Sequence, residues 1–179
     1  MSERSIEVAA MDFDHWPSVR EIYAQGIASG NATFETEAPD WREWDQSHLP
    51  TGRFVALLDG VVVGWAALSP VSDRCAYSGV AEVSVYVGVE ARGRGVGARL
   101  MGVLVSASEA LGIWTLQAGV FPENDASVRV HTRVGFRLVG RRERLGEMQG
   151  AWRDVLLLER RSTEVGTAGE EGAALPSGS

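Results

Sequence analysis

The stretch that decides the fold is VAEVSVYVGVEARGRGVGARLMGVLVSASEAL, residues 80–111. Residues 80–89 are typical of a strand, because apolar and polar side chains alternate along them. Residues 96–111 repeat apolar side chains at helical spacing, and Gly112 marks the end of that helix. The loop Arg92-Gly93-Arg94-Gly95-Val96-Gly97 joins the two elements. The centre of the chain is therefore predicted to be a strand, a glycine-rich loop and a helix.

This loop has the properties of an anion-binding site. A helix N-terminus presents unpaired backbone N–H groups and the positive end of a dipole. Glycines let an anion approach those groups closely, and Arg92, Arg94 and Arg99 add positive charge to an otherwise acidic chain. A diphosphate is the ligand that fits such a loop. The alternative is a tight turn with solvated arginines, but the flanking strand and helix favour a binding site.

Two other phosphate-binding loops fit less well. A Walker loop would end in Gly-Lys-Ser or Gly-Lys-Thr, and this loop does not. A dinucleotide-binding fold would need an acidic residue on the strand expected at residues 114–120, and that stretch carries none. A nucleotide-binding module is therefore the weaker alternative.

Composition limits the possible partners. The net charge is −7 and the pI about 5.0, so we expect no binding to nucleic acid through phosphate neutralisation. Hydrophobic residues make up 45% of the 179 residues, enough for one domain, which we expect at residues 1–161. The N-terminus has no apolar signal core and no long apolar run follows, so we expect a cytoplasmic protein without a membrane partner. Residues 162–179 are expected to form a disordered tail.

The remaining segments predict an α/β fold with a mixed sheet. Asp59-Gly60 between two β-rich runs predicts a two-residue hairpin turn, and Gly146–Gly150 predicts a second turn. Strands are expected at residues 6–10, 54–58, 61–68, 80–89, 114–120, 136–144 and 152–159, and helices at 16–27, 40–44, 96–111 and 124–133.

The strand at residues 80–89 has an unusual polar face. Its odd-numbered residues from 81 to 87 are apolar, whereas Glu82, Ser84 and Tyr86 share the other face. A central strand covered by helices on both sides should be apolar on both faces. We therefore expect this polar face to meet solvent or to line a cleft.

The motif Arg92-x-x-Gly95-x-Gly97 resembles the acetyl-CoA motif of the GNAT superfamily of N-acetyltransferases. Residues 81–87, 124–131 and 150–155 are in addition similar to the phosphinothricin and methionine sulfoximine acetyltransferases. The resemblance covers residues 6–159 and implies a mixed, mostly antiparallel central sheet flanked by helices. It also implies acetyl-CoA as co-substrate, a small-molecule amine as acetyl acceptor, and a homodimer formed through the C-terminal strands.

The resemblance assigns a cofactor site as well. The backbone of the polar-faced strand would pair with the pantetheine arm, and one of its N–H groups would polarise the thioester carbonyl. Asn124 would contact the same arm, although a residue that opens a helix is first of all expected to be its N-cap. The expected cofactor-binding residues are Val85, Tyr86, Val87, Arg92, Gly93, Arg94, Gly95, Val96, Gly97, Ala98 and Asn124.

Glu82 is the expected catalytic base. An amine must be neutral to attack a thioester, and a carboxylate on a half-buried strand beside the cofactor loop can take its proton, directly or through water. The alternative is a solvated edge-strand glutamate. Tyr86 shares that face and is a candidate proton donor to the leaving thiolate, with packing as an equal alternative. His131 matches a family histidine near the active site, whereas a lone histidine is more often a surface or core residue.

Arg74, Tyr77 and Phe34 are the candidate substrate-binding residues, together with Glu82. An amino-acid-like substrate carries a carboxylate, which an arginine can hold with two hydrogen bonds. Arg74 and Tyr77 lie just before the Glu82 strand and match the phosphinothricin enzymes, but the residues around them differ. An exposed loop arginine is the alternative for Arg74, so the identity of the substrate stays open.

Other possibilities are kept beside this one. The acceptor is alternatively a protein N-terminus or another small amine, and the chain is alternatively a non-catalytic acyl-CoA-binding domain. Direct transfer is favoured over a covalent intermediate on Cys75, because this lone cysteine has no supporting motif and is expected to be a partly buried packing residue. No metal site is expected, because the three histidines are scattered and two of them, His15 and His48, are assigned to the surface.

Overall fold

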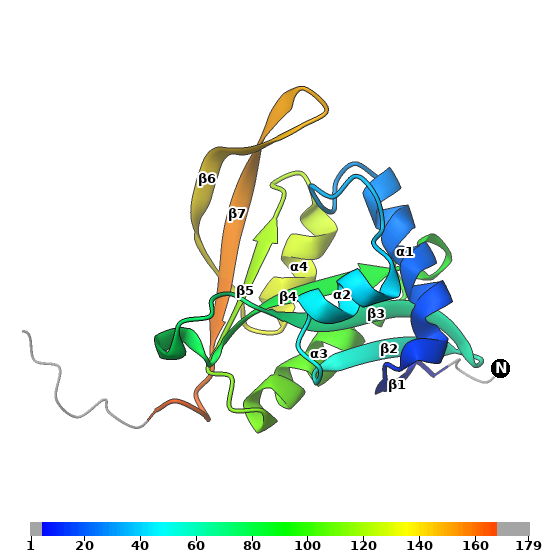
Figure 1. The fold of residues 1–179 in the computed structure, drawn as a ribbon, viewed down its shortest axis with the longest axis horizontal. Helices are drawn as coiled ribbons and strands as arrows, with labels where there is room; N and C mark the ends of the chain where they lie inside the picture. Colours follow the sequence, from blue (N-terminus) through cyan, green and yellow to red (C-terminus); the bar gives the residue numbers. More distant parts are fainter. Residues whose placement is uncertain (1–4, 168–179) are drawn as a thin grey trace, which may run out of the picture.

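The computed structural model describes residues 5–167 and forms a single seven-stranded sheet with helices on both faces (Figure 1). The strands lie in the order β1-β2-β3-β4-β5-β7-β6, and β4–β5 is the one parallel pair among them. The predicted mixed, mostly antiparallel sheet flanked by helices is therefore confirmed. The strands are β1 Glu7–Ala10, β2 Arg53–Leu58, β3 Val61–Pro70, β4 Val80–Val87, β5 Thr115–Val120, β6 Arg137–Met148 and β7 Ala151–Arg161. The helices are α1 Trp16–Ala28, α2 Trp41–Ser47, α3 Val96–Ala110 and α4 Asp125–Arg133, with 3-10 turns η1 Phe13–His15, η2 Cys75–Tyr77 and η3 Val89–Ala91.

Two tight turns close the hairpins of the sheet. Asp59 and Gly60 have φ angles of 52° and 78° between β2 and β3, which confirms the predicted two-residue turn. Gln149 and Gly150, with φ angles of 52° and 77°, make the same kind of turn between β6 and β7. The turn expected at Gly146–Gly150 is shorter than predicted, because β6 stays paired with β7 as far as Met148.

The sheet separates along its parallel pair. Strand β4 pairs with β3 from Ala81 to Val87, which is nearly its whole length. It pairs with β5 only from Val80 to Glu82. Beyond Glu82 the two parallel strands diverge, and Figure 1 shows β5 rising away from β4. This divergence leaves the β5-facing edge of β4 without a strand partner from Val83 to Val87.

Each face of the sheet has its own apolar core. On the face covered by α3 and α4, the apolar side chains of β4 and β5 pack against α3 residues such as Leu100 and Leu104. On the face covered by α1 and α2, tryptophans dominate: Trp16, Trp44 and Trp65 are all buried. The alternation predicted for residues 80–87 is confirmed, because its odd-numbered side chains lie in the first core.

The chain remains hydrogen-bonded past residue 161, the predicted end of the domain. The Ser162 side chain is buried and donates to Glu109 over 2.8 Å, and Arg161 donates to the Val165 and Gly166 carbonyls. The rest of the predicted tail, residues 168–179, lies outside the described residues. Within residues 5–167, none of the helices has the length and apolar character needed to cross a membrane.

Candidate active site at the divergence of strands β4 and β5

The free edge of β4 presents backbone groups to the gap beside β5. The Gly88 N–H donates to Val63 O over 2.8 Å, which fixes the alternation of the strand: Glu82, Ser84 and Tyr86 pair with β3. The N–H and C=O groups of residues 83, 85 and 87 consequently point toward the gap. The Val87 carbonyl already accepts a hydrogen bond from Arg92 Nε at 3.3 Å. Among the predicted strand contacts, Val85 and Val87 are therefore placed to pair with a ligand, whereas the Tyr86 backbone is not.

The N-terminus of α3 opens at the same end of the gap. The strand expected to run to Val89 ends at Val87, because the chain turns into η3 there. Gly93 and Gly95 then adopt φ angles of 75° and 82°, which a residue with a side chain rarely adopts. No side chain caps α3, and residues 92–95 are exposed. The first N–H groups of the helix are thus available to an anion, as the sequence predicted, with Arg92 and Arg94 beside them.

Glu82 lies where the parallel pairing ends. Its carboxylate accepts a hydrogen bond from Gln117 Nε2 at 3.2 Å, from the residue directly opposite on β5. The strand is half-buried as expected, but Glu82 itself is exposed, because α1 and α2 cover β4 only near its other end, at Tyr86. Gln117 was missed by the sequence analysis. A polar residue on an otherwise apolar strand was its signal, but its partner depends on a register that the sequence does not give.

Tyr86 is packed between α1 and β3. Its ring stacks on Trp65 with centroids 4.8 Å apart, contacts Tyr23 at 4.9 Å, and lies so close to Gly26 that a side chain there would overlap it. Burial and the nearby Tyr23 raise the pKa of Tyr86 well above the usual range. A phenol with a raised pKa is a weaker acid, so these contacts favour the packing alternative over proton donation.

Asn124 is the N-cap of α4, as predicted. Its Oδ1 accepts a hydrogen bond from Ser127 N at 3.1 Å, which satisfies one of the free donors of the helix. Its Nδ2 donates to Asn31 O at 3.0 Å, across 93 positions of the chain. Asn124 therefore joins the start of α4 to the segment that follows α1, a contact that the sequence analysis did not foresee.

His131 is a buried core residue at the other end of α4, 3% exposed. Its Nδ1 lies 2.7 Å from Ser127 O, and because a carbonyl only accepts, Nδ1 carries the hydrogen. Nε2 is buried without a hydrogen-bond partner, and burial lowers the pKa of the ring. The ring packs edge-on against Phe136 at 5.1 Å. Within residues 5–167, no hydrogen bond or ring contact joins His131 to Glu82 or Tyr86.

The candidate substrate residues fall into two places. Arg74 and Tyr77 lie together in the exposed loop before β4, with the guanidinium 5.5 Å from the centre of the Tyr77 ring. Phe34 instead contacts Phe121 at 4.9 Å and packs on the backbone of Gly146 in β6. The structure thus does not bring Phe34 together with Arg74. Cys75 is exposed, so its expected partial burial was wrong, because η2 lies on the surface.

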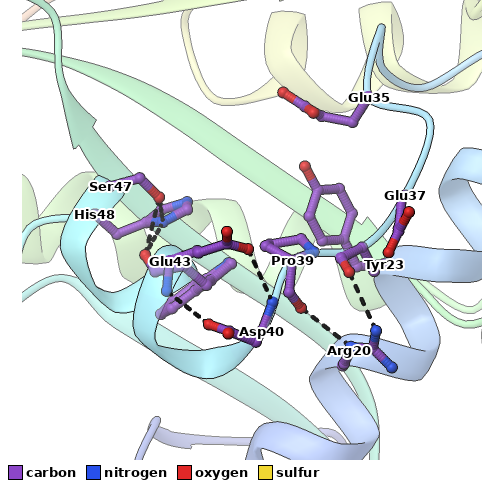
Figure 2. Close-up of a pocket in the computed structure, with 11 residues that line it drawn as sticks. Arg20, Tyr23, Glu35, Glu37, Pro39, Asp40, Glu43, Ser47 and His48 are labelled. Atoms are coloured by element: carbon purple, nitrogen blue, oxygen red, sulfur yellow. Dashed lines mark hydrogen bonds between the residues drawn. The ribbon is translucent and has the colours of Figure 1, made fainter.

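A hollow of about 640 Å³ lies on the α1 and α2 side (Figure 2). Its lining includes Arg20 and Tyr23 of α1 and four carboxylates of the segment that continues into α2, and Glu82 does not take part. His48 lines it too, partly exposed and stacked on Trp44 at 4.1 Å. Burial is the main cause that lowers the pKa of His48. Within the described residues, no three His, Cys, Asp or Glu side chains are grouped to hold a metal ion.

Comparison with known proteins adds to this geometry. The profile of the acetyltransferase (GNAT) family matches residues 16–136. An N-acetyltransferase of Streptomyces griseus is 40% identical over 164 residues, 86% of this chain and 83% of that protein. An L-methionine sulfoximine/L-methionine sulfone acetyltransferase of Pseudomonas aeruginosa is 31% identical over 80% of this chain and 87% of its own.

A solved structure agrees with both relatives. The crystal structure of a phosphinothricin acetyltransferase from Sinorhizobium meliloti, in complex with acetyl-CoA, superposes with a TM-score of 0.82 at 29% identity, over 96% of each chain. The family profile, these relatives and the fold therefore define an acetyltransferase. The chain belongs to the acetyltransferase (GNAT) family, and the acetyl-CoA dependence expected from the sequence is confirmed at the level of that family.

Proposed function

We propose that this protein transfers the acetyl group of acetyl-CoA to the primary amine of a small, amino-acid-like substrate of the phosphinothricin, methionine sulfoximine or methionine sulfone type. The observation that carries the proposal is the position of Glu82, an accessible carboxylate at the point where the free edge of β4 begins. A base at the mouth of the gap lies beside the backbone groups that would hold the acyl donor. The named substrates follow from the relatives that this chain resembles.

The residues around the gap fit the three parts of acetyl-CoA. The uncapped N-terminus of α3, with Gly93, Gly95 and Arg94, would hold the diphosphate. The N–H and C=O groups of Val85 and the N–H group of Val87 would pair with the pantetheine arm as a neighbouring strand would. One of these N–H groups would donate to the thioester oxygen when negative charge develops on it. The remaining residues of the loop, Arg92, Val96, Gly97 and Ala98, shape the same surface.

Direct transfer needs only one base. Glu82 takes a proton from the ammonium form of the substrate, and the free amine nitrogen then forms a bond to the thioester carbon. When the C–S bond breaks, coenzyme A leaves as a thiolate, and the second proton of the acetylated nitrogen passes through water to that thiolate. A thiol has an ordinary pKa near 8.5, so the thiolate can take a proton from water near neutral pH. Holding both substrates in one gap supplies much of the acceleration.

Neither of the other two catalytic candidates is required by this scheme. Tyr86 is packed on Trp65, and its raised pKa weakens it as an acid. His131 carries its hydrogen on Nδ1, where Ser127 O accepts it, so Nε2 has only a lone pair to offer. Because burial lowers the pKa of His131, the ring stays neutral near pH 7 and is not a proton donor. We therefore assign Tyr86 to packing and His131 to the support of α4.

The acceptor side rests on Arg74 and Tyr77, which lie in the loop that leads into β4. Their exposure leaves the guanidinium of Arg74 free to hold the carboxylate of an amino-acid-like substrate with two hydrogen bonds. The expected homodimer stays a prediction from the resemblance. The two strands that the resemblance assigns to the interface, β6 and β7, carry four exposed large apolar side chains: Leu138, Val139, Leu145 and Trp152.

Replacing Glu82 by glutamine tests the proposal. The substitution keeps the hydrogen bond with Gln117 possible but removes the base, so kcat should fall by about 100-fold or more. The dissociation constant for acetyl-CoA should change by less than about twofold, because no cofactor contact is assigned to this side chain. Thiol release from acetyl-CoA with phosphinothricin, methionine sulfoximine and methionine sulfone gives the rates.

Glu7→Gln, at an exposed position of the edge strand β1, is the matched control and should leave the rate unchanged. A Glu82→Gln enzyme with the wild-type rate would contradict the base assignment. An N-terminal peptide in the same assay separates the alternatives: faster release with the peptide than with any amino acid analogue would favour a protein acetyltransferase. Acetyl-CoA binding with no thiol release for any amine would favour a non-catalytic binding domain.

A further inference from the structure

The segment Gly30–Glu35, here called the strap, links the two sides of the gap. It leaves α1 without forming a helix or strand and passes beside the start of α4 (Figure 1). At one end Asn31 O accepts the hydrogen bond from Asn124. At the other end Glu35 lines the same hollow as Tyr23, whose ring contacts Tyr86 of β4 at 4.9 Å, so this part of the strap lies beside the polar face of β4. The strap therefore reaches from β4 to the turn that follows β5.

One arginine from a distant strand holds the strap in this position. Arg153 of β7 donates from Nη1 to Gly30 O at 3.0 Å and from Nη2 to Asn31 Oδ1 at 3.1 Å. The same Nη2 lies 3.2 Å from the Glu123 carboxylate, and the guanidinium lies 4.0 Å from the centre of the Phe121 ring. The Arg153 side chain is only 18% exposed. Phe34 of the strap packs on that same Phe121 ring.

These contacts depend on two properties that arginine has and lysine lacks. A planar fork reaches two acceptors at once, and its flat face covers an aromatic ring. The partner Glu123 is ionised, because a hydrogen bond from its own backbone N–H and a second one from Arg153 lower its pKa. A lysine at this position would keep the charge but could not hold Gly30, Asn31 and Phe121 together.

We propose that Arg153 is a positioning residue for acetyl transfer, which fixes the strap as a wall of the acceptor site and so sets the affinity for the amine. The inference rests on the proposed function, because it takes the gap at Glu82 as the place of transfer. Arg153 touches neither Glu82 nor the N-terminus of α3. The strap carries Phe34, one of the candidate substrate-binding residues, so we expect Arg153 to act on the binding of the amine rather than on the chemistry or on the cofactor.

A second arginine provides a matched control on the same segment. Arg20 of α1 donates from Nε to Pro39 O at 3.0 Å and from Nη2 to Ala38 O at 3.2 Å. It thus holds the later half of the connection between α1 and α2 by the same chemistry, at the hollow rather than at the gap (Figure 2). Replacing either arginine would loosen the connection between α1 and α2. A loss of strap position would follow only from the change at Arg153.

The experiment compares Arg153→Met, Arg153→Lys and Arg20→Met with the full chain, using the amine that the wild type acetylates fastest. For Arg153→Met we expect the KM for the amine to rise about tenfold or more, because a small displacement of a positioning wall is enough for such a loss. The kcat and the acetyl-CoA dissociation constant should stay within about threefold of wild type. Arg153→Lys should recover the KM only in part, and Arg20→Met should leave it within about twofold.

Three outcomes would overturn the inference. The amine KM of Arg153→Met would stay unchanged, or Arg20→Met would raise it equally, or the loss would appear in acetyl-CoA binding instead. Thermal unfolding of each variant, with and without acetyl-CoA, separates a folding defect from a shift in KM. Failure of the proposed function has a different signature, since the wild type would then release no thiol with any amine, or Glu82→Gln would keep its rate.

Discussion

Helices α3 and α4 follow neighbouring parallel strands, yet their N-termini are completed in opposite ways. Since β4 and β5 are parallel, both helices begin at the same edge of the sheet. At α3 the cap position is Gly95, with a φ of 82° and no side chain to accept from the first turn. At α4 the cap position is Asn124, whose side chain accepts from Ser127 and donates to the strap.

The difference separates a helix start that is open to a ligand from one that is closed by the protein itself. One of the free N–H groups of α4 is satisfied inside the chain by Asn124, so fewer of them are left for an anion. Those of α3 depend on an external partner, and the sequence supplies arginines rather than an acceptor beside them. Two helix starts at one edge therefore have distinct tasks: α3 faces the cofactor, and α4 anchors the strap.

The largest effect is expected from a substitution that caps the open N-terminus of α3. Gly95→Asp would place a carboxylate at the cap of α3, where it would compete with the diphosphate and repel it. We expect the dissociation constant for coenzyme A to rise about 100-fold, measured by titration calorimetry. Gly95→Asn introduces a side chain of the same shape as aspartate but without charge, and asparagine tolerates a positive φ. The affinity for coenzyme A should therefore fall only about tenfold. Equal affinities of the two variants would show that no anion meets this helix end.

A smaller effect should follow from a substitution that removes the cap at the N-terminus of α4. Asn124→Ala removes the cap of α4 and the hydrogen bond to Asn31, so the free energy of unfolding should fall by about 2 kcal/mol. Asn124→Asp keeps the cap acceptor but loses the donor, and it should therefore recover about half of that loss. Urea unfolding curves give both values. If Asn124→Ala is as stable as wild type, α4 does not depend on its cap and the contrast with α3 fails.

The smallest effect is expected on the stability of the protein at mildly acidic pH. Burial lowers the pKa of His131 in the folded state, so the unfolded chain binds a proton first as the pH falls through about 6.5. The stability that the neutral ring contributes is complete above that pH and is lost below it. At pH 6 the loss due to His131 is at most about 1 kcal/mol.

His131→Gln isolates this contribution from that of His48, whose pKa is lowered in the same direction. The variant should show a smaller fall in the urea midpoint between pH 7.5 and pH 6 than the wild type does. Identical slopes for the two proteins would mean that His131 titrates as freely in the folded chain as in the unfolded one.

Local chemistry explains what the sequence predicted well. The Asp59-Gly60 turn, the Asn124 cap and the glycine loop each depend on residues within a few positions of one another, so their types alone decide the structure. The apolar face of β4 was equally readable, because alternation is a local pattern. The acetyltransferase assignment drew on the same loop and was confirmed.

Long-range pairing explains what the sequence did not predict. Gln117 meets Glu82 only because of the β4–β5 register, and Arg153 reaches Gly30 across 123 positions. The exposure of Glu82 depends on where α1 and α2 end over the sheet, which no local pattern encodes. The same holds for Phe34, which packs beside β6 rather than beside Arg74. Each of these positions is a product of topology and not of neighbouring residues.

The short pairing between β4 and β5 has a consequence for the cohesion of the whole sheet. Only three residue pairs join β4 to β5. The sheet therefore consists of a four-stranded part, β1 to β4, and a three-stranded part, β5 to β7, held together by this short pairing. Amide hydrogens of Val85 and Val87, which lie beyond the last β4–β5 pair, should exchange with solvent faster than those of Ser84 and Tyr86, which pair with β3. A cofactor arm bound along β4 would make the backbone hydrogen bonds that β5 does not make there. The ligand would then act as an additional strand that connects the two parts of the sheet.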